Sequence, residues 1–169
     1  MASNNKIVVA IATCFGVGKL PYMPGTWASF FSILFLSLFI LVTKNYLLVF
    51  LVLLLLFLLG TWASDEYSKH TGHHDPKEIV IDEVVGQILT IFIAVPFANI
   101  DTSNFFNLRG FLFLLVTFIL FRLFDITKPW PVSFVDTNIR RGIGVMLDDV
   151  VAGLMAGLIF AAFLAIPTG

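Results

Sequence analysis

Two adjacent pairs of acidic residues stand within apolar stretches of the sequence. Asp82 and Glu83 interrupt the run Ile-Val-Ile-Asp-Glu-Val-Val-Gly, and Asp148 and Asp149 open an apolar segment near the C-terminus. If these stretches cross a membrane, each carboxylate at its centre costs about 2.5–3.5 kcal/mol, so a cation, a metal ion or water must compensate. Oxygen ligands of this kind suit Mg²⁺ or Mn²⁺. We therefore expect all four residues to bind a metal ion; the alternative is that they are helix caps and N-terminal helix charges.

A third charged group follows another apolar stretch, in Phe-Arg-Leu-Phe-Asp-Ile-Thr-Lys-Pro-Trp-Pro. Asp125 is expected to be a further metal ligand, or to hydrogen-bond the groups that bind the metal. Lys128 is expected to hold a phosphate as a compact positive charge. Its alternative role is an ordinary i,i+3 salt bridge with Asp125. Arg122, Arg140 or Arg141 is expected to supply a second phosphate-binding cation.

Two loop features complete the set of candidate residues. His74, which precedes Asp75, is the best candidate for proton transfer among the three histidines, although solvated loop histidines are common. The glycine-rich segment 16–26 fits neither a P-loop nor a dinucleotide fingerprint. It ends in Thr26, which is expected to cap the first membrane helix and to contact phosphate, the alternative being a plain turn. Because the sequence carries neither a cysteine-phosphatase loop nor a nucleophile elbow, we expect a metal-activated water to be the nucleophile.

The composition indicates which elements must position these residues. The chain has 169 residues, of which 59% are hydrophobic and only 12% charged, and its mean hydropathy is +0.98. Soluble domains carry roughly a quarter charged residues, so this chain is expected to be an integral membrane protein. Its length predicts one domain over residues 1–169. A net charge of −1 gives no attraction to nucleic acid.

About five transmembrane helices are predicted, in an all-α polytopic bundle. A helix needs about 20 apolar residues to cross the hydrocarbon. The predicted spans are 27–43, 45–63, 79–98, 110–124 and 149–166, the first two forming a helical hairpin. Segment 7–18 is too short and too glycine-broken to cross, so it is expected to lie in the interface or to be re-entrant.

Five spans divide the cations unequally between the two faces of the membrane. One face would hold Lys6, Lys19, Lys69, Lys77, Arg122, Lys128, Arg140 and Arg141, and the other only Lys44 and Arg109. The positive-inside rule makes the first face cytoplasmic. Every acidic residue except Asp101 falls on that same face. The candidate site is therefore expected at the cytoplasmic interface of the membrane.

The ordered motifs resemble those of the phosphatidylglycerophosphatase A family. The resemblance rests on Gly16-Val-Gly18, Pro24-Gly25-Thr26, His74-Asp75, the stretch from Val80 to Gly86, the stretch from Phe121 to Pro131, and the stretch from Gly142 to Gly153. It implies a Mg²⁺-dependent enzyme of the bacterial cytoplasmic (inner) membrane. The implied reaction removes the terminal phosphate of phosphatidylglycerophosphate, which yields phosphatidylglycerol and inorganic phosphate.

Two functions of other classes remain open at this point. A divalent-cation transporter or channel subunit would use the same carboxylates as an ion path. Transporters tend to bind ions near the membrane midplane and to contain internal repeats, whereas here the acids lie at one end of their spans and we find no repeat. A non-catalytic lipid-binding subunit would not need so many carboxylates. Hydrolysis of a lipid phosphate is therefore the favoured function, with the oligomeric state left open.

Overall fold

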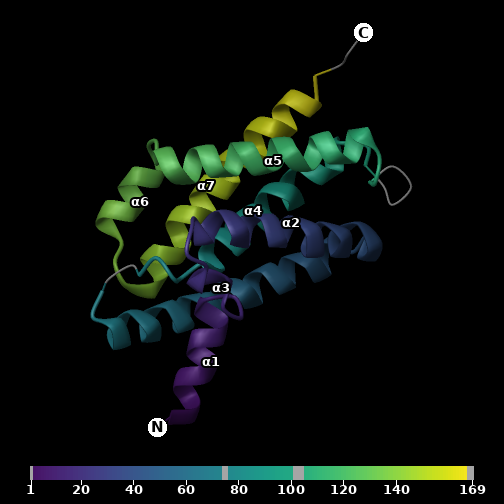
Figure 1. The fold of residues 1–169 in the computed structure, drawn as a ribbon. Coiled ribbons are helices and arrows are strands. Elements are labelled where there is room, and N and C mark those ends of the chain that lie inside the picture. Colours follow the sequence, from purple (N-terminus) through teal and green to yellow (C-terminus); the bar gives the residue numbers. More distant parts are fainter. Residues whose placement is uncertain (1, 74–75, 101–104, 167–169) are drawn as a thin grey trace.

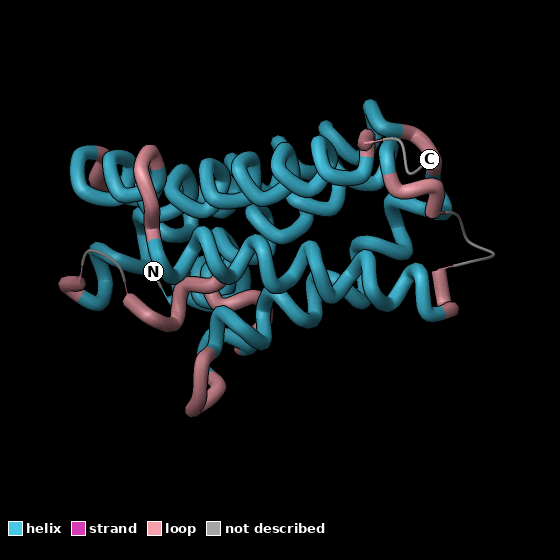
Figure 2. Tube along the Cα trace, turned by 90° about the horizontal axis from the view of Figure 1, so that it is seen from above, coloured by secondary structure: helices cyan, strands magenta, loops and turns pink. Residues whose placement is uncertain are grey.

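The computed structural model describes residues 2–73, 76–100 and 105–166, except for the side chains of 2–5, 35–38, 40 and 41. All the regular elements in the described part of the chain are helices, and it contains no strand (Figure 1). Its elements are α1 (Ala2–Ala12), η1 (Val17–Lys19), α2 (Pro24–Thr43), α3 (Tyr46–Thr71), α4 (Ile81–Ala94), η2 (Val95–Phe97), α5 (Leu108–Thr127), α6 (Val132–Asn138) and α7 (Arg141–Leu164). The prediction of an all-α fold is confirmed, and Figure 2 shows the helices joined by short loops.

The helix boundaries follow from local capping chemistry. The side chain of Asn45 accepts a hydrogen bond from the Leu48 amide at 3.0 Å and so begins α3. Asn107 caps α5 in the same way. Gly72 ends α3 in the left-handed conformation that glycine adopts at little cost. Lys128 ends α5 in that same conformation, directly before Pro129, which cannot continue a helix.

Five helices run alternately between the two ends of the bundle. Helices α2, α4 and α7 begin at one end, which we call the site end, and α3 and α5 finish there. Figure 1 shows α5 along one side of the bundle and α3 along the other, with α4 and α7 between them. This alternation brings the start of α4, the finish of α5 and the first half of α7 together, although they are far apart in sequence.

The crossing of α4 and α7 depends on small residues. A Cβ atom on Gly153 would lie 2.4 Å from the Gly86 carbonyl oxygen, and one on Gly86 would lie 2.6 Å from the Asp149 carbonyl oxygen. The Thr90 hydroxyl donates to the Gly86 carbonyl at 2.9 Å or to the Gly153 carbonyl at 3.2 Å. Backbones can approach this closely only where side chains are small. The close crossing holds the two acidic pairs near one another.

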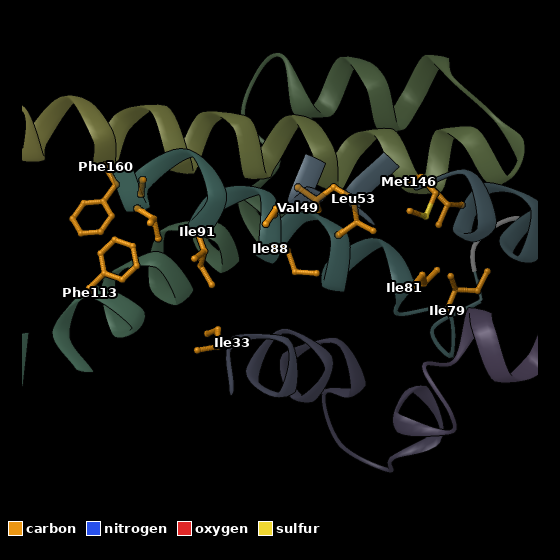
Figure 3. Packing of buried hydrophobic residues seen from close by; sticks show 14 of the residues in the cluster. Ile33, Val49, Leu53, Ile79, Ile81, Ile88, Ile91, Phe113, Met146 and Phe160 are labelled. Atoms are coloured by element: carbon orange, nitrogen blue, oxygen red, sulfur yellow. The ribbon is translucent and has the colours of Figure 1, made fainter. Parts of the chain in front are cut away.

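An apolar core extends along the bundle away from the site end (Figure 3). Met146 and Ile81 lie in the part nearest the site end, where Met146 is fully buried. At the other end, the rings of Phe113 and Phe160 stack with their centroids 5.6 Å apart. The core therefore fixes α4, α5 and α7 relative to one another in the part of the bundle that extends from the polar residues of the site end to the other end.

The outer surface of the bundle suits a membrane. Among the described residues, three helices are long and apolar enough to cross one: Tyr46–Thr71, Leu108–Thr127 and Arg141–Leu164. Large apolar side chains are exposed on each of them, including Leu55, Leu115 and Leu158. Apolar surface of this extent is rare on soluble monomers, whereas lipid would cover it. Membrane association is thus supported.

The prediction of five spans is not confirmed. The helix expected over 79–98 ends at Ala94, and its 14 residues reach about 21 Å, less than the ~30 Å hydrocarbon thickness. Nine of those residues are buried, so α4 is a central helix that other helices shield. Helix α1 has 11 residues, and it is followed by a turn and η1. It is therefore too short to cross, in line with the expected interfacial or re-entrant segment.

Cysteine labelling tests whether the alternating helices cross the bilayer. Thr137 lies at the site end and Phe106 at the far end, and both side chains are exposed. In a background carrying Cys14→Ala, Thr137→Cys should react with an impermeant maleimide only from the cytoplasm, and Phe106→Cys only from outside. Labelling of both from one side would exclude the alternating membrane topology.

Candidate functional site

The two acidic pairs converge at the site end, as the sequence predicted. Asp82 lies in the first turn of α4 with 9% of its surface exposed, while Asp148 and Asp149 on α7 are 6% and 3% exposed. The Asp149 carboxylate interacts electrostatically with those of Asp82, Glu83, Asp125 and Asp148. Like charges this close repel strongly in a low-dielectric interior. A bound cation would relieve that repulsion.

Helix capping does not explain Asp148 and Asp149. Helix α7 begins at Arg141, seven residues earlier than Asp148, so both acids lie two turns inside the helix. The capping alternative is therefore wrong for this pair. For Asp82 and Glu83 the alternative was N-terminal helix charges, and it remains applicable because both residues lie in the first turn of α4.

Arg122 links two of the carboxylates across the bundle. Its Nη1 atom lies 3.3 Å from Glu83 Oε1 on α4 and 2.5 Å from Asp125 Oδ2 one turn along α5. All three side chains are largely buried. Paired guanidinium and carboxylate groups share their charge and fix each other's orientation. Arg122 thus lies within the acidic cluster, whereas Arg140 and Arg141 begin α7, roughly 10 Å along its axis from Asp148.

Lys128 pairs with residues other than the predicted Asp125. Its ammonium lies 2.7 Å from Asp148 Oδ2 and also hydrogen-bonds the Asp136 carboxylate of α6. Burial tends to lower the pKa of Lys128, but these hydrogen bonds outweigh burial and raise its pKa above the usual range. The side chain is 31% exposed, so a charged lysine stands at the edge of the acidic cluster, within reach of solvent.

The first turn of α2 closes the site from another side. A Cβ atom on Gly25 would lie 1.4 Å from Glu83 Oε1, so only glycine permits the observed contact with that carboxylate. Thr26 is the third residue of α2, which begins at Pro24; its predicted role as N-cap is therefore wrong. Proline at the first helical position accounts for the earlier start, since its missing amide hydrogen is not needed there.

Several buried polar atoms in these elements have no hydrogen-bond partner in the described part of the chain. They include the hydroxyls of Thr26 and Ser29, both amide atoms of Gln87, Nε of Arg122 and Oδ2 of Asp149. Such atoms are costly to bury, so they point to a ligand, an ion or water in the working protein. No sequence motif pointed to Ser29 or Gln87. Their spacing is the signal that was available, because Ser29 follows Thr26 by three residues and Gln87 follows Glu83 by four.

The donor chemistry fits Mg²⁺. The cluster offers only carboxylate, hydroxyl and amide oxygens, and Asp149 Oδ2 is a buried oxygen in need of a partner. Within the described ranges, however, no three His, Cys, Asp or Glu side chains are already arranged to hold a metal ion. Mg²⁺ usually keeps several waters and takes one or two carboxylates from the protein. Among Asp82, Glu83, Asp148 and Asp149, one or two would bind the ion directly and the others would contact its waters.

The remaining candidates lie outside the cluster or outside the described residues. Arg141 interacts electrostatically with Asp65 of α3, and Arg140 is exposed. His74, the predicted proton-transfer residue, is outside the described residues. Burial, followed by the charges of Asp82 and Glu83, raises the pKa of Cys14 to about 12. The thiol therefore stays protonated near neutral pH, and a protonated thiol is a poor nucleophile.

Comparison with known proteins relates the chain to an enzyme family. The model of the phosphatidylglycerophosphatase A family matches residues 10–164. Phosphatidylglycerophosphatase A of Escherichia coli is 32% identical over 151 residues, which cover 89% of this chain and 80% of that protein. The Haemophilus influenzae protein of the same name is 34% identical over 153 residues, which cover 90% of this chain and 85% of that protein.

A third relative carries a different name. A protein of Bacteroides thetaiotaomicron, provisionally named a phosphatidylinositol-3-phosphatase, is 37% identical over 157 residues, which cover 90% of this chain and 91% of that protein. No solved structure matches the chain. The extent of the family match and the coverage of these relatives lead to one assignment, which the order of the sequence motifs had predicted: the chain belongs to the phosphatidylglycerophosphatase A family.

Proposed function

We propose that this protein hydrolyses the terminal phosphate of phosphatidylglycerophosphate to phosphatidylglycerol and inorganic phosphate, with Mg²⁺ as cofactor. The observation that carries the proposal is the convergence of buried carboxylates from α4, α5 and α7 with Arg122 and Lys128 at one end of an apolar bundle. The family is one of phosphatases, and two of the relatives are named for this activity. A lipid headgroup can enter at the end of a bundle while its tails stay in the membrane.

The charge balance of the site supports a cofactor of positive charge. The carboxylates of Asp82, Glu83, Asp125, Asp148 and Asp149 outnumber the two cations beside them. A doubly negative phosphate would be repelled by this cluster as it stands. Bound Mg²⁺ would neutralise phosphate charge and lower the pKa of a water molecule that serves as nucleophile.

The chain's own residues would bind and orient the phosphate. Lys128 would hold a phosphoryl oxygen from the solvent side, and Arg122 would hold another from within the bundle. The Thr26 and Ser29 hydroxyls, buried and unpartnered in the described chain, would donate to further oxygens near the first turn of α2. His74, or a carboxylate of the cluster that does not bind the metal ion, would accept the proton of the attacking water.

The proposed location is the cytoplasmic face of a bacterial inner membrane. The support is the excess of lysine and arginine in the connections at the site end, which the positive-inside rule assigns to the cytoplasm. The three relatives are bacterial proteins. The family assignment gives no support to the divalent-cation transporter that the sequence left open.

A substrate panel tests the proposal. Purified protein in mixed micelles is given phosphatidylglycerophosphate, phosphatidylinositol 3-phosphate or glycerol 3-phosphate, with Mg²⁺ or with a chelator. Phosphate release should be fastest from phosphatidylglycerophosphate, lost with the chelator and restored by Mg²⁺. Faster release from phosphatidylinositol 3-phosphate would instead show that this protein has the substrate specificity after which the Bacteroides relative is named. No release from either lipid would exclude a lipid phosphatase.

A glycine-to-alanine substitution tests whether the first turn of α2 positions Glu83. Gly25→Ala cannot keep the observed contact, because the new methyl group would overlap the Glu83 carboxylate. A displacement of about 1 Å at a reacting site costs up to roughly 10²-fold in rate, so turnover should fall by about 10–10². Gly72→Ala is the control: the left-handed cap at the end of α3 costs about 1–2 kcal/mol when glycine is replaced, but it is remote from Glu83. Equal turnover in the two variants would contradict the positioning role.

A further inference from the structure

We infer that an apolar groove between α1, α2, α3 and α4 binds an acyl chain of the lipid substrate. The groove has a volume of about 700 Å³ and is lined by side chains from all four helices and from the turn before η1. Cavities that hold small molecules span about 300–1,000 Å³, so this one is large enough for a lipid segment. The inference rests on the proposed function, because it concerns the same substrate.

The lining matches a hydrocarbon chain and little else. Phe31 of α2, Val52 and Leu56 of α3 and Ile81 of α4 form opposing apolar walls. The Ser32 hydroxyl also belongs to the lining, but it donates to the Ser29 carbonyl at 2.7 Å. A polar ligand would therefore give up its hydrogen bonds to water without gaining any in the groove. An acyl chain makes no hydrogen bonds to water, so it loses none on entering the groove.

The groove adjoins the candidate phosphatase site. Ile81 and Val84 line it from α4, and they flank Asp82 and Glu83 in the same helical turn. Cys14, which also lines the groove, is close enough to interact electrostatically with both carboxylates. A lipid whose chain enters here would hold its headgroup beside the acidic cluster.

The groove also runs in the required direction. Helix α3 ends at the site end, so Leu59 lies nearer to that end than Val52 does. These two lining residues are separated by about 10 Å along the helix axis. The groove therefore extends from the headgroup site toward the bilayer interior, which is the path of an acyl chain. Figure 1 shows α1 meeting α3 at this part of the bundle.

Two adjacent leucines of α3 provide a matched test. Leu56 lines the groove, whereas Leu55 is 55% exposed and is not part of the lining. Leu56→Trp should fill the groove, and Leu55→Trp should only enlarge the outer surface. For each variant, kcat/KM is measured on phosphatidylglycerophosphate with sixteen-carbon and with six-carbon chains. One methylene in an apolar pocket is worth about 10–200-fold, so Leu56→Trp should lower the long-to-short ratio at least about tenfold. Leu55→Trp should leave the ratio unchanged.

Equal long-to-short ratios of kcat/KM in the two variants would overturn the inference. The proposed phosphatase function would still stand, because both variants would still hydrolyse the substrate. If Leu56→Trp fails to fold, Val52→Trp repeats the test one turn deeper in the groove. A binding measurement is independent of turnover: phosphatidylglycerol with a diazirine in one acyl chain is photolysed on the protein, and the labelled peptides are mapped. Labelling should concentrate on the groove walls of α2 and α3 and decline in Leu56→Trp. Even labelling of all outward helix faces, unchanged in that variant, would mean surrounding bilayer lipid only and would also overturn it.

Discussion

Replacing Lys128 with alanine should lower kcat/KM for phosphatidylglycerophosphate by about 10²–10³, or roughly 3–4 kcal/mol, as expected for loss of one preorganised transition-state donor. The ammonium lies 2.7 Å from Asp148 and is partly open to solvent, so it can reach both the acidic cluster and an incoming phosphate. Lys128→Arg should restore only part of the activity, because a planar guanidinium does not reproduce a compact ammonium. Steady-state kinetics in micelles, with thermal unfolding of each variant, would measure these effects.

Lys69→Ala is the matched control for the loss of ion pairs. Lys69 also binds two carboxylates, Asp65 at 2.8 Å and Glu66 at 2.7 Å, but on the exposed end of α3. Exposed pairs contribute about 0–1 kcal/mol to stability, and this one has no place in the proposed chemistry. Lys69→Ala should therefore retain full turnover. A Lys128→Ala enzyme as active as Lys69→Ala would show that Lys128 only secures α6 to α7.

Replacing Asp149 or Asp82 with asparagine should lower turnover by at least about 10²-fold, because each change removes a charge while keeping the shape of the side chain. Asp149 is nearly inaccessible and its Oδ2 has no hydrogen-bond partner within the described chain. Without a cation, its neighbours of like charge destabilise it. Asp149→Asn should therefore unfold at an equal or higher temperature than the wild type when Mg²⁺ is absent, although it is inactive.

The control for the acidic substitutions is Glu66→Gln, which removes a charge from the exposed end of α3. Turnover in Glu66→Gln should match the wild type. If Asp149→Asn and Asp82→Asn kept near-full turnover and instead lost thermal stability, both carboxylates would be structural. The proposed site predicts the opposite: turnover is lost, and thermal stability is kept or raised.

The sequence predicted the helices and the convergence of their charges. The helices follow from local apolar runs, and the convergence follows from the number of residues that a helix needs to cross a bilayer. Apolar runs mark the helices, and the predicted spans place both acidic pairs on the same face of the membrane. The length of α4 was overestimated, since a buried central helix is as apolar as a spanning one. Hydropathy alone cannot distinguish the two.

The partners of individual side chains could not be predicted. Lys128 was paired with Asp125 by spacing along a helix, but the helix ends at Thr127, and Lys128 reaches Asp148 and Asp136 on other elements. Asp125 binds Arg122 instead. Such choices depend on how α5, α6 and α7 pack in three dimensions. Spacing along one helix gives the neighbours on that helix and no others.

Binding of Mn²⁺, followed by electron paramagnetic resonance in the presence of the purified protein, tests most directly whether the carboxylates of α4 and α7 form the cation site of a phosphatase. Wild-type protein and Glu66→Gln should remove free Mn²⁺ from solution, and added Mg²⁺ should release it. Asp149→Asn should bind Mn²⁺ at least about tenfold more weakly, because even groups that only support metal ligands contribute 10–100-fold in affinity. Equal Mn²⁺ binding by the wild type and Asp149→Asn, or none by either, would contradict the proposed site.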